Sequence, residues 1–154
     1  MSIFLENKRF EIALYEPQIP LNLGAIMRTT FVFDVILHII HPLGFIFKNK
    51  KNLGRSSLDY EPIYIEHNSF KDFLEKTKDQ RKVLFTPHTS LNVKDFIFKE
   101  NDILVFGREE DGMETENMGL MDALVSIPMF VNARSLNLSV SVGMGGIIAI
   151  LKQI

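Results

Sequence analysis

Three short segments carry the kinds of polar side chain that catalysis uses, set among residues that otherwise suit a protein core. They are residues 22–28 (NLGAIMR), 106–112 (FGREEDG) and 133–139 (ARSLNLS). Arg, Asn, Ser and Glu side chains can hold a phosphate, orient a hydroxyl or stabilise developing negative charge, and guanidinium stays charged throughout. Each segment follows a predicted strand. We therefore expect one site assembled from three distant parts of the sequence.

The residue types that are missing narrow the chemistry. The sequence has no Cys, which excludes disulfides, thiolate catalysis and most structural zinc sites and fits a reducing cytosol. Its four His residues are scattered without the spacing of a metal site. We predict a site that uses no metal.

Composition predicts one compact α/β unit over residues 1–154, because 46% of the residues are apolar and no linker or repeat interrupts them. The net charge of −2 excludes general attraction to nucleic acid, so any such contact needs a local patch. One basic stretch offers it, and two interpretations stay open for it: phosphate contact or a solvated loop. The residues are Lys48, Lys50, Lys51 and Arg55.

Neither a secretory signal nor a membrane span is expected. The N-terminal residues lack a basic segment followed by an apolar one. The longest apolar stretch, near 140–151, is too short and too rich in Gly for a bilayer, which requires roughly 20 apolar residues. The expectation is a cytoplasmic protein without a membrane anchor.

Strand and helix patterns alternate along the chain. Short β-branched runs closed by Pro or Gly predict strands, and apolar periodicity after a capping residue predicts helices. Asn22 is the predicted N-cap of the first helix, and Ser69 that of the second. Strands are predicted at 10–15, 35–41, 63–66, 82–86, 103–106 and 124–127, and helices at 23–33, 70–78, 114–122 and 137–153.

This alternation favours a mostly parallel sheet with helices on both faces. Ligands of such sheets bind beyond the carboxyl ends of the strands, where all three polar segments would lie.

The last predicted helix is apolar on nearly every side and contains Gly143, Gly145 and Gly146. Each Gly costs about 1 kcal/mol in a helix interior relative to Ala, so close backbone approach is expected there. We predict a fully buried helix, most simply at a homodimer interface; a core helix of a monomer is the alternative.

The three segments together resemble the SpoU-type branch of the SPOUT methyltransferases, which methylate RNA ribose with S-adenosylmethionine. The shared motifs are Asn22-x-Gly24-x-x-x-Arg28, Phe106-Gly107-x-Glu109-x-x-Gly112, and Ile127-Pro128-Met129 followed by Ser135-Leu136-Asn137-Leu138-Ser139. Their order and spacing agree over residues 12–154. Residues 14–20, 37–45 and 58–60 are similar to the single-domain subfamily that methylates the wobble nucleotide of tRNA, cytidine or uridine 34. The resemblance implies a C-terminal deep trefoil knot.

The resemblance also implies residue roles. Arg28 is the main catalytic residue, and we favour an electrostatic role over that of a general base, because guanidinium does not deprotonate. The implied catalytic set is Arg28, Asn22, Glu109, Ser135 and Asn137. The implied S-adenosylmethionine-binding set is Thr86, Gly107, Ile127, Met129, Ser135 and Leu136. The implied partner is the tRNA anticodon stem-loop, contacted by Lys48, Lys50, Lys51 and Arg55.

Structural interpretations of the same residues stay open. Asn22, Ser135 and Asn137 could serve as helix caps, Arg28 as a solvated helix residue, and Glu109 as one of three consecutive acids. The chain also departs from the family pattern: Met113-Glu114 stands where Leu-Pro is usual, which puts the rigidity of that loop in question. Alternative functions are 2′-O-methylation of another tRNA position or of ribosomal RNA, a non-catalytic RNA- or nucleotide-binding module, and, more remotely, a flavodoxin-like nucleotide protein.

Overall fold

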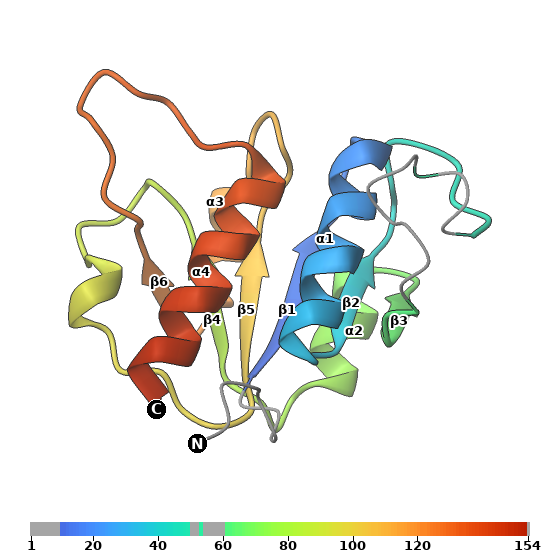
Figure 1. The fold of residues 1–154 in the computed structure, drawn as a ribbon, viewed down its shortest axis with the longest axis horizontal. Coiled ribbons are helices and arrows are strands. Elements are labelled where there is room, and N and C mark those ends of the chain that lie inside the picture. Colours follow the sequence, from blue (N-terminus) through green and yellow to red (C-terminus); the bar gives the residue numbers. More distant parts are fainter. Residues whose placement is uncertain (1–9, 50–52, 54–60, 154) are drawn as a thin grey trace.

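The described chain forms a single parallel sheet with helices on both sides (Figure 1). The computed structural model describes residues 10–49, 53 and 61–153. The six strands lie in the order β3-β2-β1-β5-β4-β6, and every neighbouring pair is parallel. The predicted α/β class is confirmed. The strands are β1 Phe10–Tyr15, β2 Leu37–Ile40, β3 Tyr64–His67, β4 Lys82–Phe85, β5 Asp102–Phe106 and β6 Ala123–Val125.

Two helices cover each face of the sheet. Helices α1 (Pro20–Phe33) and α4 (Leu138–Gln153) pack side by side on one face, and α2 (Phe70–Lys76) and α3 (Thr115–Met118) lie on the other (Figure 1). A short 3-10 turn, η3 (Val93–Asp95), follows β4. The core is accordingly split into one apolar cluster on each side of the strands. Strand β2 is buried along its whole length, as its β-branched run predicts.

The start of α1 differs from the prediction. The helix begins at Pro20, three residues earlier than expected, with Ile19 at the N-cap position and no capping side chain of its own. Asn22 is therefore not the N-cap; it lies buried inside the first turn. Proline is favoured at the first helical position because its fixed φ suits a helix and its missing N–H has no partner to lose there. By contrast, Ser69 caps α2 as predicted, accepting a hydrogen bond from the Asp72 N–H.

Within the single chain, helix α4 is only partly buried, so the alternative of a monomer's core helix does not hold, and burial at a homodimer interface stays a prediction. Gly146 faces α1 so closely that a Cβ would lie 2.4 Å from the Phe33 ring, and Gly145 faces two sheet phenylalanines. The opposite side of α4 exposes an apolar row, formed by Val140, Met144, Ile147 and Leu151. No helix in the described residues is long and apolar enough to cross a membrane.

The sheet order brings four strand ends together at one edge. Because β1, β5, β4 and β6 are neighbours in that order and all run the same way, the loops that follow them begin side by side. After β6 the chain first pairs with the segment after β4, where Ser126 donates to the Leu91 carbonyl and accepts from the Val93 N–H. It then runs to α4 (Figure 1). The knot implied by the resemblance concerns this passage and stays a prediction.

Candidate active site

A cavity of about 330 Å³ opens at this edge of the sheet. Three loops surround it: residues 86–88 after β4, 107–113 after β5, and 127–136 before α4. Its lining combines the apolar side chains of Ile127, Met129 and Leu136 with three consecutive acids of the β5 loop. All the residues singled out for cofactor binding line it, namely Thr86, Gly107, Ile127, Met129, Ser135 and Leu136.

Glu109 ties the β5 loop to the beginning of α1. Its carboxylate accepts hydrogen bonds from the backbone N–H groups of Gln18 and Ile19, both at 2.8 Å, and from Asn22 Nδ2 at 3.3 Å. These N–H groups precede the first helical hydrogen bonds and would otherwise need another partner. Glu109 thus supplies from a distant loop the cap that α1 lacks locally.

Asn22 extends this connection to the third segment. Its Oδ1 accepts a hydrogen bond of 3.2 Å from Asn137 Nδ2. Asn137 in turn precedes α4, and its own Oδ1 accepts from the Val140 N–H at 3.2 Å, as an N-cap does. We call Asn22, Glu109 and Asn137 the rim network. The three polar segments of the sequence therefore meet, and the capping interpretation of Asn137 holds together with its contact to Asn22.

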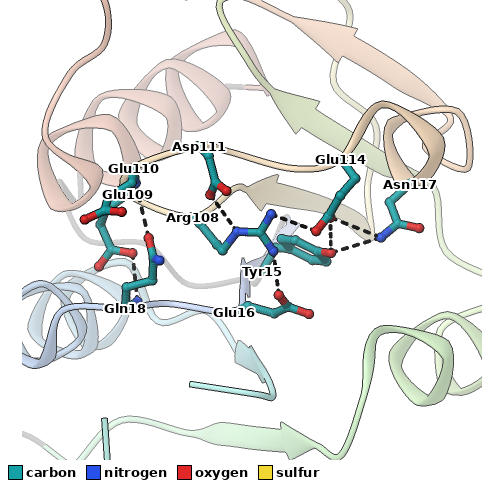
Figure 2. A network of polar contacts seen from close by, with 9 residues as sticks. All are labelled: Tyr15, Glu16, Gln18, Arg108, Glu109, Glu110, Asp111, Glu114 and Asn117. Carbon is teal, nitrogen blue, oxygen red and sulfur yellow. Dashed lines mark hydrogen bonds and ion pairs between the residues drawn. The ribbon is translucent and has the colours of Figure 1, made fainter. Parts of the chain in front are cut away.

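Next to Glu109, the side chain of Arg108 points away from the rim network into a second set of contacts, shown in Figure 2. Its guanidinium pairs with Glu16 at 2.6 Å, Asp111 at 2.7 Å and Glu114 at 2.8 Å. It also lies 5.1 Å from the centre of the Tyr15 ring. Only 13% of the Arg108 side chain is exposed.

The other carboxylate oxygen of Glu114 accepts a 2.5 Å hydrogen bond from the Tyr15 hydroxyl. The Tyr15 hydroxyl and Arg108 together lower the pKa of Glu114 to about 2, so this carboxylate stays ionised at any working pH. Burial, followed by the bond to Glu114, raises the pKa of Tyr15 to about 12. The three carboxylates raise the pKa of Arg108 above its ordinary value despite the opposing effect of burial.

The remaining candidate residues lie elsewhere. Arg28 is exposed on α1 and is not among the residues that line the cavity. Lys48 is exposed in the segment after β2. Lys50, Lys51 and Arg55 lie outside the described residues. Within the described ranges, no three His, Asp or Glu side chains are arranged to hold a metal ion.

Sequence reasoning missed the Arg108 contacts. Their partners Tyr15 and Glu16 stand more than 90 positions away along the chain, and only the β1–β5 pairing brings them together. One available signal was the charge pattern itself, because Arg108 is followed by five acids between residues 109 and 116.

The cavity suits a ligand with a flat apolar ring and a cationic centre. Met129, Leu136 and Ile127 offer apolar surface. The three acids of the β5 loop outnumber the two arginines of the lining, Arg108 and Arg134, and so favour positive charge nearby. Gly107 leaves the loop compact: a Cβ there would lie 2.8 Å from the Gly112 backbone. An adenosine carrying a sulfonium has both features, so the residues present fit S-adenosylmethionine.

Comparison with known proteins agrees with this geometry. The model of the SpoU rRNA Methylase family matches residues 9–146. The tRNA (cytidine(34)-2′-O)-methyltransferase of Escherichia coli K12 is 36% identical over 135 residues, which are 83% of each chain. The protein of the same name from Ancylobacter novellus is 34% identical over 134 residues, 84% of each chain.

Solved structures show the same fold. One, described as giving structural insights into the 2-OH methylation of C/U34 on tRNA, superposes with a TM-score of 0.87 at 35% identity over 94% of this chain and 95% of the other. The SpoU methyltransferase AviRb from Streptomyces viridochromogenes, in complex with AdoMet, superposes with a TM-score of 0.82. At 21% identity over 97% of this chain and 60% of that one, AviRb supports the fold alone.

Proposed function

The chain belongs to the SpoU rRNA Methylase family, and from this premise we propose that it methylates the ribose 2′-oxygen of the wobble nucleotide, C34 or U34, of tRNA. The methyl donor is S-adenosylmethionine, whose sulfonium supplies the transferable methyl group. The rim network carries the proposal, because it joins all three polar segments beside a cavity that fits this donor. The reaction takes place in the cytoplasm, where its substrate is.

The proposal assigns cofactor binding to the residues that line the cavity. Apolar contact with the adenine falls to Met129 and Leu136, and backbone groups near Thr86, Gly107 and Ile127 are available for its polar edge. Ser135 is an exposed residue of the lining. Asn22, Glu109 and Asn137 hold the loops in register, so that the donor and the ribose meet in line. Positioning of this kind can remove of order 7–11 kcal/mol from a barrier.

Arg28 supplies the permanent cation. The 2′-hydroxyl gives up its proton to water during transfer, and a guanidinium stabilises the negative charge that develops on the oxygen without having to accept that proton. Arg28 shares an exposed face of α1 with Leu21 and Val32, at helical spacings of seven and four residues. Arg28 is not among the residues that line the cavity of its own chain, so we propose that it acts on the cavity of a second copy.

A homodimer would cover that face. The exposed apolar row of α4 (Val140, Met144, Ile147 and Leu151) recurs every three or four residues, and the side chains are 37–63% exposed. Beside it, Leu21 and Val32 of α1 are 60% and 61% exposed. A Cβ at Gly143 would meet nothing within 4 Å in the chain itself, so the close approach expected of this Gly is available to a partner. We propose the α1–α4 face as the homodimer interface.

The RNA partner in this proposal is the anticodon stem-loop of tRNA. Lys48, with Lys50, Lys51 and Arg55, would contact its phosphates from the segment after β2. Binding through these residues should weaken steeply with salt, because each neutralised phosphate releases counterions.

The test of the activity is direct. We would incubate the protein with methyl-labelled S-adenosylmethionine and unmodified tRNA, then map the labelled nucleotide by nuclease digestion and mass spectrometry. Label on the 2′-oxygen of nucleotide 34 is expected. Label at another position, label on ribosomal RNA only, or no label with a folded protein would contradict the assignment.

The test of the dimer uses complementation. Arg28→Ala removes the cation and leaves the cavity open, whereas Ser135→Trp fills the exposed end of the cavity and keeps Arg28. Each variant alone should be inactive. If Arg28 serves the partner's cavity, the two variants refolded together regain activity, because one site per mixed dimer has both features. An inactive mixture, or a wild-type protein that sediments as a monomer, would overturn this arrangement.

A further inference from the structure

The β5 loop is a cavity wall that depends on few contacts of its own. Residues 107–113 all line the cavity, yet the loop closes on itself through only two backbone hydrogen bonds, exchanged between Arg108 and Gly112 at 3.0 and 3.1 Å. Gly112 takes a positive φ of 66° at the turn. Such a loop needs external contacts to stay in one conformation.

The contacts of Arg108 provide them. Its guanidinium joins the loop to Glu16 at the end of β1, to Asp111 across the turn, and to Glu114 before α3 (Figure 2). Glu114 is the member that connects this cation to the fold beyond the loop, because its second oxygen accepts from the Tyr15 hydroxyl. Asn117 of α3 also donates to that hydroxyl, at 2.9 Å.

The position of Glu114 matters for a second reason. The loop leads into α3 at this residue, which stands at the helix N-cap with φ −60° and ψ 143°. An extended, flexible residue here would free the end of the wall at Met113. The ion pair and the bond to Tyr15 instead fix residue 114 from its side chain.

We propose that Glu114 is a positioning residue for S-adenosylmethionine: with Tyr15 it fixes Arg108, and thereby the cavity wall formed by residues 107–113. The inference rests on the proposed function, since it concerns that cofactor. Glu114 itself is not among the residues that line the cavity, so its effect passes through Arg108 and the loop.

The same loop carries one member of the rim network, Glu109. Glu109 follows Arg108 directly, and the Glu110 N–H donates to the Gln18 side chain at 3.2 Å. The contacts of Arg108 and those of Glu109 and Glu110 therefore order the cavity wall before the cofactor binds. Without Glu114, part of the free energy of binding would be spent on ordering the wall.

The experiment compares Glu114→Ala, Glu114→Pro and Glu116→Ala. Glu116→Ala is the matched control, because it removes an exposed acid two residues further along in α3. Glu114→Pro restores rigidity without a carboxylate, since the φ of −60° at this position is the one that proline adopts. Calorimetry would give the dissociation constant of S-adenosylhomocysteine, and steady-state kinetics the KM for S-adenosylmethionine and the kcat.

Glu114→Ala should raise the dissociation constant and the KM by about tenfold, the size expected when a loop must be ordered on binding, and leave kcat at saturation within about twofold. Glu114→Pro should recover most of the affinity. Glu116→Ala should behave as the wild-type protein does.

Three outcomes would overturn the inference: unchanged affinity in Glu114→Ala, an equal loss in Glu116→Ala, or no recovery in Glu114→Pro. The last would mean that fixing residue 114 does not order the wall. A wild-type protein that binds no S-adenosylhomocysteine would instead contradict the proposed function.

Discussion

Two polar clusters lie in this fold, and they differ in almost every respect that matters for function. The rim network of Asn22, Glu109 and Asn137 joins three loops at the carboxyl ends of the strands, beside a cavity. The second cluster, which we call the histidine pair, consists of His38 on β2 and His67 on β3. Both histidines are buried under α2, and neither is among the cavity-lining residues.

The histidine pair lies in a buried series of contacts. His38 Nε2 lies 2.6 Å from a Glu11 carboxylate oxygen, and His38 Nδ1 lies 2.8 Å from His67 Nε2. Phe73 packs edge-on against both rings. His67 Nδ1 is buried and has no hydrogen-bond partner, with the Asp72 carboxylate 3.9 Å away.

The comparison shows that a buried polar cluster can take part in a reaction only where a ligand can reach it. In the rim network, donors and acceptors from separate segments converge where a ligand can reach them. The histidine pair is buried, its ring nitrogens other than His67 Nδ1 are paired within the cluster, and neither ring lines the cavity. Its titration therefore acts on stability, while the rim network acts on the reaction. Variants should separate the two effects.

The largest effect is expected from Arg28→Ala. Removing one group that stabilises developing oxyanion charge lowers kcat by about 10²–10³-fold. The free energy of unfolding should change by about 1 kcal/mol at most, because the side chain is exposed on its own chain and leaves no cavity when it is removed. Methyl transfer to tRNA and urea unfolding measure the two quantities. Lys71→Ala, on the exposed side of α2, is the control; a kcat within threefold of wild type for Arg28→Ala would refute the role.

The histidine pair predicts a pH-dependent stability. Burial, followed by the charge of His38, lowers the pKa of His67 from 6.5 to about 4. Between these values the unfolded chain binds a proton that the folded chain does not. The stability is therefore full above pH 6.5 and decreases as the pH falls toward 4, by about 3 kcal/mol in total.

His67→Gln should flatten this decrease, because an amide does not titrate. Urea unfolding of both proteins at several pH values between 4 and 7 measures the slope. Activity of His67→Gln at pH 8 should stay within about twofold of wild type. Equal slopes for the two proteins, or a selective loss of activity in the variant, would break the distinction between the two clusters.

Glu109→Gln should have a moderate effect on both stability and activity, with a smaller change of stability than the titration of His67 produces. The amide keeps the shape of the side chain but has a single oxygen for the Gln18 and Ile19 N–H groups. A loss of about 1–2 kcal/mol in unfolding free energy and a tenfold lower kcat are expected, since hydrogen bonds to a charged group are involved. Glu116→Gln, at an exposed acid outside the cavity lining, is the control. Equal losses of unfolding free energy and of kcat in the two variants would contradict a specific role for Glu109.

Most of the fold could be predicted because it depends on local pattern. The β-branched run of β2, the Ser69 cap and the strand-ending prolines act over a few residues, and the predicted strands and helices are found with shifted ends. The start of α1 was not predicted correctly, because Asn22 is a common capping residue. Here the cap comes from Glu109, 87 positions away. Pro20 was the local signal for the true start.

The site was predictable only in part for the same reason. The motifs named residues that the fold does bring together, such as Asn22 and Asn137. The contacts of Arg108 with Tyr15 and Glu16, and the pairing of His38 with His67, depend on which strands are neighbours. The apolar pattern of α4 predicted that the helix is buried, either within one chain or in a dimer. Only the packing of Gly146 against Phe33 shows which side of α4 faces its own chain and which side remains exposed.

The most direct measurement for the whole account is amide hydrogen exchange with and without S-adenosylmethionine. We propose that the three loops bind the methyl donor together. Added cofactor should therefore slow amide hydrogen exchange in residues 107–113 and 127–137 far more than in β2 and β3. Unchanged exchange in those loops, or protection centred on the histidine pair, would contradict the account.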